Sequence, residues 1–137
     1  MINFNINFKL LYIFRDVFRK TKDEQDNCLI HYLAQKCFNG MINTKEKYVK
    51  KSDSNIPGYC GMAPIHFAAR YGTNFKDTEK TMKTMMDFMD DPHQEDEFGN
   101  TVLHYAILNS EDIRYDKMTS NVFPLIVKYN FAQEWPG

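Results

Sequence analysis

The chain has 137 residues, of which 43% are hydrophobic and 26% are charged, and its formal net charge is −1. These values are typical of one folded domain with a modest core, and they argue against binding nucleic acid through a strongly basic surface. The three cysteines, Cys28, Cys37 and Cys60, show neither CxxC nor zinc-finger spacing, which favours buried free thiols and a reducing, intracellular setting.

Hydrophobic residues recur at helical spacing over residues 8–20 and predict an amphipathic helix. Polar residues interrupt the stretch and no cleavage pattern follows it, so we expect neither a secretion signal nor a transmembrane helix. We expect residues 1–22 to cap the hydrophobic end of the domain that follows. Binding of this helix to a partner or to a membrane surface is the alternative.

One short phrase occurs three times, as NCLIHYLA at 27–34, APIHFAA at 63–69 and TVLHYA at 101–106. Its histidines, His31, His66 and His104, are 35 and 38 residues apart. Such recurrence is typical of stacked-repeat proteins, and the spacing is close to the ankyrin period of about 33 residues. We therefore expect a repeat domain over residues 23–137, with repeats at roughly 23–56, 57–95 and 96–131.

In the first repeat we expect an inner helix that runs to about Cys37 and is broken at Asn39-Gly40. The charged segment Lys45–Lys51 then suggests a short outer helix, and residues 52–58 form a turn-rich finger.

The second repeat has the clearest helix signals. Pro64 suits the first turn of the inner helix, and Gly72 marks its end. Four methionines follow at helical spacing and predict one buried stripe, with an adaptable binding groove as the alternative. These are Met82, Met85, Met86 and Met89. Residues 73–81 look like an insertion before the outer helix.

In the third repeat the acidic connector Asp90–Glu97 leads into the turn 98–100, and we expect the hydroxyl of Thr101 to cap the inner helix. The connector lacks the EF-hand order, so a solvated face that meets a basic partner is expected in place of a calcium site. The apolar residues of 122–129 predict a final outer helix that closes the stack, preceded by an insertion at 111–121.

These residues resemble the ankyrin repeat family, whose pattern is G-x-T-P-L-H-x-A-A-x-x-G followed by V-x-x-L-L. The resemblance implies an all-α ankyrin-repeat solenoid, in which each histidine has a structural role and its ring bridges backbone groups of neighbouring turns. The first repeat is degenerate and keeps its histidine. The residues that would have structural roles are His31, Gly61, Pro64, His66, Ala69, Gly72, Gly99, Thr101 and His104.

The irregular repeats and the phrases NCLIHYLA and DEFGNTVLHYAI are similar to the I-kappa-B-like ankyrin (vankyrin) proteins of insect polydnaviruses. This resemblance implies a viral protein that binds host Rel/NF-κB dimers and suppresses immune transcription in the host cytoplasm, with the nucleus as a second compartment. Ser52–Asn55 lacks the D-S-G-x-x-S degron pattern, so the inhibition would not be relieved by phosphorylation. A general ankyrin adaptor or host-directed effector with another partner is the alternative, and a small enzyme or regulatory subunit is a third.

The sequence has no phosphate loop, nucleophile elbow or HExxH motif, so we expect no enzyme, no metal and no cofactor. A protein is the expected partner, without direct contact to nucleic acid, membrane or a small-molecule substrate. We expect the binding surface on the concave side, at the fingers 56–62 and 94–100 and at exposed positions of the inner helices. The candidate contact residues are Ile56, Tyr59, Met62, Phe67, Arg70, Gln94, Glu97, Phe98 and Tyr105.

Overall fold

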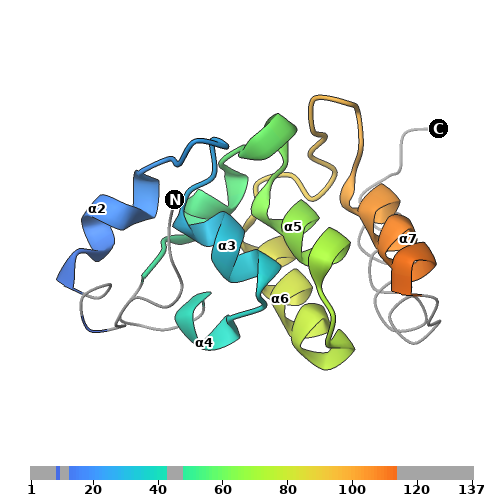
Figure 1. Cartoon of the computed structure of the whole chain (residues 1–137), viewed down its shortest axis with the longest axis horizontal. Helices are drawn as coiled ribbons and strands as arrows, with labels where there is room; N and C mark the ends of the chain where they lie inside the picture. Colours follow the sequence, from blue (N-terminus) through green and yellow to red (C-terminus); the bar gives the residue numbers. More distant parts are fainter. Residues whose placement is uncertain (1–8, 10–12, 43–47, 114–137) are drawn as a thin grey trace.

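The computed structural model describes residue 9 and residues 13–42 and 48–113 (Figure 1). This part of the chain contains helices and no strand, which confirms the helical class expected from the sequence for the residues described. The α-helices are α2 (Arg15–Lys20), α3 (Leu29–Gln35), α4 (Asn39–Ile42), α5 (Pro64–Tyr71), α6 (Phe75–Phe88) and α7 (Val102–Ile113). Two short 3-10 helices, η1 (Lys51–Asn55) and η2 (Tyr59–Gly61), lie between α4 and α5.

The helices α3, α5 and α7 lie side by side in a row, with α5 packed against both of the others (Figure 1). Each of the first two is followed by a partner helix: α4 packs on α3, and α6 packs on α5 and α4. The loops that lead into the three row helices all lie along the upper edge in Figure 1. The segment around α2 lies at the end of the row beside α3.

The three loops before the row helices, which we call the finger loops, span residues 23–27, 58–62 and 96–100. In each loop the first N–H donates to the fifth carbonyl, in the pairs Asp23–Asn27 (2.8 Å), Gly58–Met62 (2.8 Å) and Asp96–Asn100 (3.0 Å). The fourth residue of each has a positive φ: Asp26 (65°), Gly61 (75°) and Gly99 (77°). The first loop therefore shares this hydrogen bond and this positive φ with the other two, although Asp26 stands where they have the glycine that such a φ favours. The second loop differs at its third residue, because Cys60 also has a positive φ of 54°.

The core is formed by the facing sides of α3, α5 and α6 together with the start of α7. The four methionines, three in α6 and Met89 directly after it, are all buried, as their spacing predicted, and none is more than 7% exposed. Small residues fill the tightest positions, since Ala68 and Ala69 of α5 are almost completely buried between the helices. Asn109 of α7, 2% exposed, donates to the carbonyl oxygens of Ala69 (2.7 Å) and Gly72 (2.9 Å) and so ties α7 to the end of α5.

The N-terminal segment is attached by one apolar and one charged contact. Phe18 packs on the core, and Arg19 Nε lies 3.2 Å from a carboxylate oxygen of Asp53, which is 1% exposed. Ile13, Phe14 and Val17 are each about half exposed or more, at 57%, 49% and 62%. Of the predicted helix at 8–20, the structure describes regular helix over Arg15–Lys20, and residues 1–8 and 10–12 lie outside the described part.

Three details of the predicted boundaries are wrong. The first inner helix ends at Gln35 and is followed by Cys37 with φ 56°, whereas Asn39-Gly40 begins α4 and does not break a helix. Of the predicted outer helix at Lys45–Lys51, residues 48–50 are not helical and Lys51 begins the 3-10 helix η1, while residues 43–47 lie outside the described part. The segment 73–81 is mostly helical, because α6 begins at Phe75. The predicted helix at 122–129 also lies outside the described residues.

Gly72 and Gly40 form a matched pair for testing this packing. A Cβ on Gly72 would lie 2.7 Å from the carbonyl oxygen of Ala68 and 2.8 Å from Cγ2 of Thr78, whereas no residue that the structure describes lies within 4 Å of a Cβ on Gly40. Gly72→Ala should lower the free energy of unfolding by about 1–3 kcal/mol, because both neighbours belong to packed helices. Gly40→Ala should leave it unchanged or raise it by up to about 1 kcal/mol. Urea denaturation measures both, and equal stability of the two variants would contradict the described packing at the end of α5.

Candidate functional site

The ring of His31 is fully buried and uses both of its nitrogens. Nδ1 accepts a hydrogen bond from the backbone N–H of Cys28 at 3.0 Å, and Nε2 lies 2.8 Å from the carbonyl oxygen of Ile56. Because a backbone N–H can only donate, Nδ1 carries no proton, and Nε2 is the nitrogen that donates to Ile56. The ring therefore caps α3 and also holds the segment that enters the second finger loop.

His66 makes the same two hydrogen bonds one unit further along the row. Its Nδ1 accepts from the N–H of Ala63 at 3.0 Å, and its Nε2 lies 3.1 Å from the carbonyl oxygen of Gln94. Ile56 and Gln94 each stand two residues before a finger loop, so the two acceptors are equivalent. This geometry agrees with the bridging role that we expected for these two histidines.

At the third unit, His104 Nδ1 accepts from the N–H of Thr101 at 2.9 Å. The hydroxyl of Thr101 lies 3.0 Å from the same nitrogen. The histidine ring thus takes the N–H of the residue that precedes α7, and the hydroxyl of Thr101, which we expected to cap the helix, faces the same ring nitrogen. The ring of His104 is exposed, unlike those of His31 and His66.

Burial decides the charge of the two bridging rings. It lowers the pKa of His31 and of His66 from 6.5 to about 4, and the hydrogen bonds to backbone carbonyls offset only part of that effect. Both rings are therefore neutral near pH 7, and their nitrogens are already engaged. In the described part of the chain, no group of His, Cys, Asp and Glu side chains is arranged to hold a metal ion.

The first and third finger loops share an Asp–Tyr pair that sequence reasoning missed, half-buried in the first loop and buried in the third. The hydroxyl of Tyr32 donates to Asp23, and that of Tyr105 donates to Asp96. The other carboxylate oxygen of each aspartate accepts two N–H groups of its own loop. Burial alone would raise the pKa of Asp96, but these hydrogen bonds outweigh it and hold the pKa below its ordinary value. Burial, followed by the bond to Asp96, raises the pKa of Tyr105 to about 12.

In the middle unit Gly58 and Phe67 occupy the positions of the aspartate and the tyrosine. Both partners of the Asp–Tyr pair are thus replaced together, and the middle unit has no carboxylate or phenol left unpaired at these two positions. A Cβ on Gly58 would lie 2.8 Å from Nε2 of His31, which explains why a larger residue does not fit. The ring of Phe67 packs edge-on against His31 at 5.4 Å between centroids, and Tyr105 packs against His66 at 5.3 Å.

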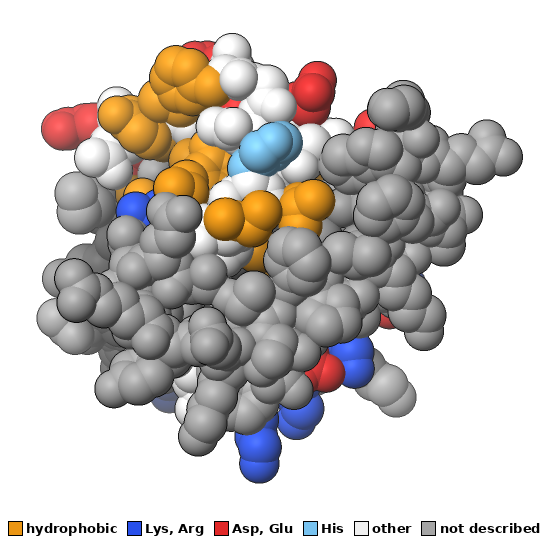
Figure 2. Space-filling view, turned by 90° about the vertical axis from the view of Figure 1, so that its right-hand side faces the viewer, with side chains coloured by type: hydrophobic (Ala, Val, Ile, Leu, Met, Phe, Trp, Pro, Cys, Tyr) orange, Lys and Arg blue, Asp and Glu red, His pale blue; other side chains and the backbone are white. Residues whose placement is uncertain are grey.

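The candidate binding surface is the exposed part of the three finger loops, which we call the finger edge. Tyr59 is 53% exposed and Phe98 is 71% exposed, on neighbouring loops that are joined by the hydrogen bond from Glu97 N–H to Cys60 O at 3.0 Å. No lysine or arginine occurs in the three loops. Exposed carboxylates lie on or beside them, at Glu24, Asp26, Glu95 and Glu97. The acidic side chains at the upper edge of Figure 2 lie near hydrophobic ones.

The structure distributes the predicted contact residues unevenly. Tyr59, Glu97 and Phe98 are exposed, and Ile56, Arg70 and Gln94 are half-buried. Met62, Phe67 and Tyr105 are buried, at 5%, 5% and 7% exposure. The expectation that Phe67 and Tyr105 lie at exposed positions is wrong, because their rings pack against the histidines of the preceding unit.

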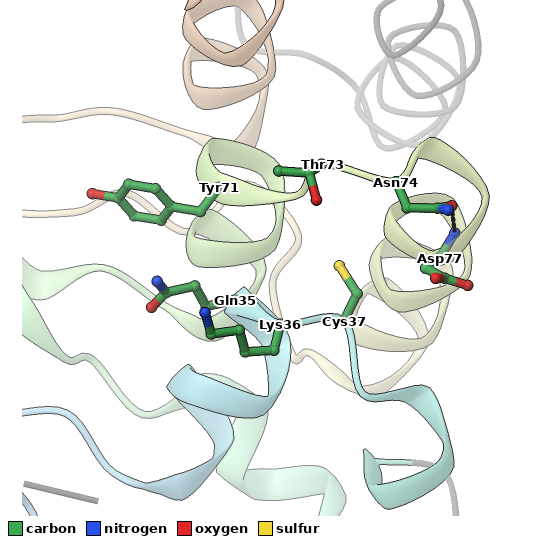
Figure 3. Close-up of a pocket in the computed structure, with 7 residues that line it drawn as sticks. All are labelled: Gln35, Lys36, Cys37, Tyr71, Thr73, Asn74 and Asp77. Carbon is green, nitrogen blue, oxygen red and sulfur yellow. Dashed lines mark hydrogen bonds between the residues drawn. The ribbon is translucent and has the colours of Figure 1, made fainter. Parts of the chain in front are cut away.

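A cavity of about 230 Å³ lies where α3 and α5 end and α6 begins (Figure 3). Its lining is mixed in charge, with Lys36, Asp77 and the half-buried thiol of Cys37 among others. Burial raises the pKa of Cys37, so the thiol stays protonated and is a weak nucleophile. Asn74 accepts the N–H of Asp77 at 3.1 Å and thereby caps α6. These residues form no nucleophile–base pair, and the cavity gives no support to a catalytic role.

Neither a protein-family model nor a curated protein sequence matches this chain. None of the helices in the described part is long and apolar enough to cross a membrane.

The two bridging histidines make stability depend on pH. Their pKa is lower in the folded protein than in the unfolded chain, so between pH 6.5 and about 4 the unfolded state binds protons that the folded state does not. The free energy of unfolding should therefore be constant above pH 6.5 and fall by about 1.4 kcal/mol per pH unit for each histidine as pH decreases.

Urea denaturation between pH 6.5 and pH 5 tests this, because carboxylates titrate mainly below that range. His66→Phe removes one of the two groups and should halve the slope, even if it lowers stability at every pH. A slope near zero in the unmodified protein would show that the rings are not buried as neutral groups.

Proposed function

We propose that this chain is an ankyrin-type repeat protein that binds another protein through its finger edge. Three features support the ankyrin-type assignment: the row of α3, α5 and α7, the shared hydrogen bonds of the finger loops, and the bridging by His31 and His66. The observation that carries the binding role is the exposure of Tyr59 and Phe98 on loops whose backbones are held in place.

Exposed aromatic side chains are costly in water and are typical anchors of protein interfaces. Tyr59 and Phe98 stand on short loops with fixed hydrogen bonds, so binding would order few additional groups. The surrounding carboxylates would favour a partner whose surface is apolar at the centre and basic at the rim. Such a contact would form more slowly as the salt concentration rises.

For the partner we propose a host Rel/NF-κB dimer, on the basis of the resemblance to I-kappa-B-like viral ankyrin proteins. The chain would then hold the transcription factor inactive in the host cytoplasm and suppress the immune response. Within residues 52–55, Ser52 is exposed, but the environment of Ser54 supports resistance to phosphorylation at that serine. Ser54 is fully buried with its hydroxyl donating to Lys51 O at 2.6 Å, and Asp53 is paired with Arg19, so a kinase would have to unfold η1 to reach Ser54.

A general ankyrin adaptor with another basic partner is the second candidate. The same surface supports it, because exposed aromatic and acidic side chains suit any apolar surface with a basic rim.

The double variant Tyr59→Ala/Phe98→Ala should weaken binding to a recombinant Rel homology dimer at least tenfold, because both anchors would be lost. Its melting temperature should change little, since both side chains are mainly exposed. Isothermal titration calorimetry measures the affinity.

Phe14→Ala is the control, because Phe14 is 49% exposed, precedes α2 and belongs to none of the three finger loops. Equal weakening by Phe14→Ala would contradict the finger edge as the binding surface. If the unmodified chain did not bind the dimer, the Rel assignment would be wrong and the general adaptor would remain.

A further inference from the structure

A groove of about 490 Å³ lies between α4 and α6, at the lower edge of the molecule in Figure 1 and opposite the finger loops. Its volume falls within the range of pockets that bind ligands. Its lining contains two ammonium groups, an amide, a hydroxyl and a glycine, from Asn39, Gly40, Lys80, Lys83 and Thr84. Figure 2 shows lysine and arginine side chains at the lower edge of the molecule, with an acidic side chain among them.

The polar wall of the groove is held in a fixed position. Asn39 donates to the carbonyl oxygen of Asp77 at 3.2 Å and accepts from the hydroxyl of Thr81 at 3.0 Å, which joins α4 to α6. Gly40 stands beside it, and no described residue lies within 4 Å of where a Cβ would be, so the described part of the chain leaves the backbone open to close approach there. The groove therefore has one rigid, open wall of uncharged polar groups.

The other wall is basic. Lys80 and Lys83 are exposed on α6, and Lys76 lies one turn before them. Lys83 contacts Glu79 at 3.0 Å, but both side chains are substantially exposed, so water screens this pair and another carboxylate can replace it at little cost. No carboxylate is among the residues that line the groove in the described part of the chain.

From this arrangement we propose that the groove between α4 and α6 binds an acidic peptide segment of a second protein. Carboxylates of the segment would face Lys80 and Lys83, and its backbone would lie along Gly40. Nucleic acid or an anionic bilayer is less favoured as the ligand. The affinity for either of them rises with the number of lysine and arginine contacts, whereas this chain has a net charge of −1 and an acidic opposite edge. The proposal is independent of the Rel assignment and would allow the chain to hold a basic and an acidic partner on opposite edges.

Fluorescence anisotropy with a labelled peptide of alternating Glu and Ser tests this proposal, with the corresponding Gln–Ser peptide as the neutral probe. The full chain should bind the acidic peptide and not the neutral one. Lys80→Glu/Lys83→Glu should weaken binding at least tenfold, because both cations of the groove would be reversed.

Lys20→Glu/Lys50→Glu is the matched control, since both lysines are exposed, neither lines the groove, and the change in net charge is the same. Equal weakening by the two double variants would mean that only net charge matters, and would overturn the site. Absence of binding to the acidic peptide, or stronger binding to single-stranded RNA or phosphatidylserine vesicles, would also overturn it. Tyr59→Ala/Phe98→Ala should bind the acidic peptide normally, which separates this result from that of the finger edge.

Discussion

The neutral imidazole ring is the group on which the arrangement of this protein depends. A histidine at the third position of a helix takes the free N–H at the start of that helix, and its other nitrogen reaches the chain entering the next unit. One side chain thus pairs a free N–H at the start of its own helix and also a backbone carbonyl of the chain that enters the next unit. Because the rings of His31 and His66 are buried, each bond would be costly to leave unmade.

Once the rings are in place, they constrain the residues around them. The aromatic side chain that follows His66 packs against His31, and the one that follows His104 packs against His66, which buries Phe67 and Tyr105. Where a tyrosine stands there, an aspartate of the same unit accepts its hydroxyl; where a phenylalanine stands, the aspartate is replaced by Gly58. The hydrogen bonds from the two rings also hold the chain that enters the second and third finger loops. The exposed side chains of Tyr59 and Phe98 therefore stand on loops whose backbones are already fixed.

The repeated phrase in the sequence was sufficient to predict the three row helices and the places of the histidines, and the helical spacing of the four methionines was sufficient to predict their burial. It was not sufficient where the structure uses a residue against its usual preference. Cys37 has a positive φ without being glycine, so the end of α3 and the start of α4 were misplaced. Hydrophobic periodicity also does not show which neighbouring ring covers Phe67. The nine-residue interval between aspartate and tyrosine in the first and third units was a usable signal for the Asp–Tyr pairs. No pattern in the sequence indicated that Met62 would be buried.

The most direct test of the bridging account is the tautomeric state of the two buried rings, measured by long-range nitrogen–proton correlation NMR at pH 7. We predict that His31 and His66 are both neutral and protonated at Nε2, and that the amides of Cys28 and Ala63 exchange slowly with solvent. A proton on Nδ1 of either ring, or rapid exchange of these two amides, would contradict the account.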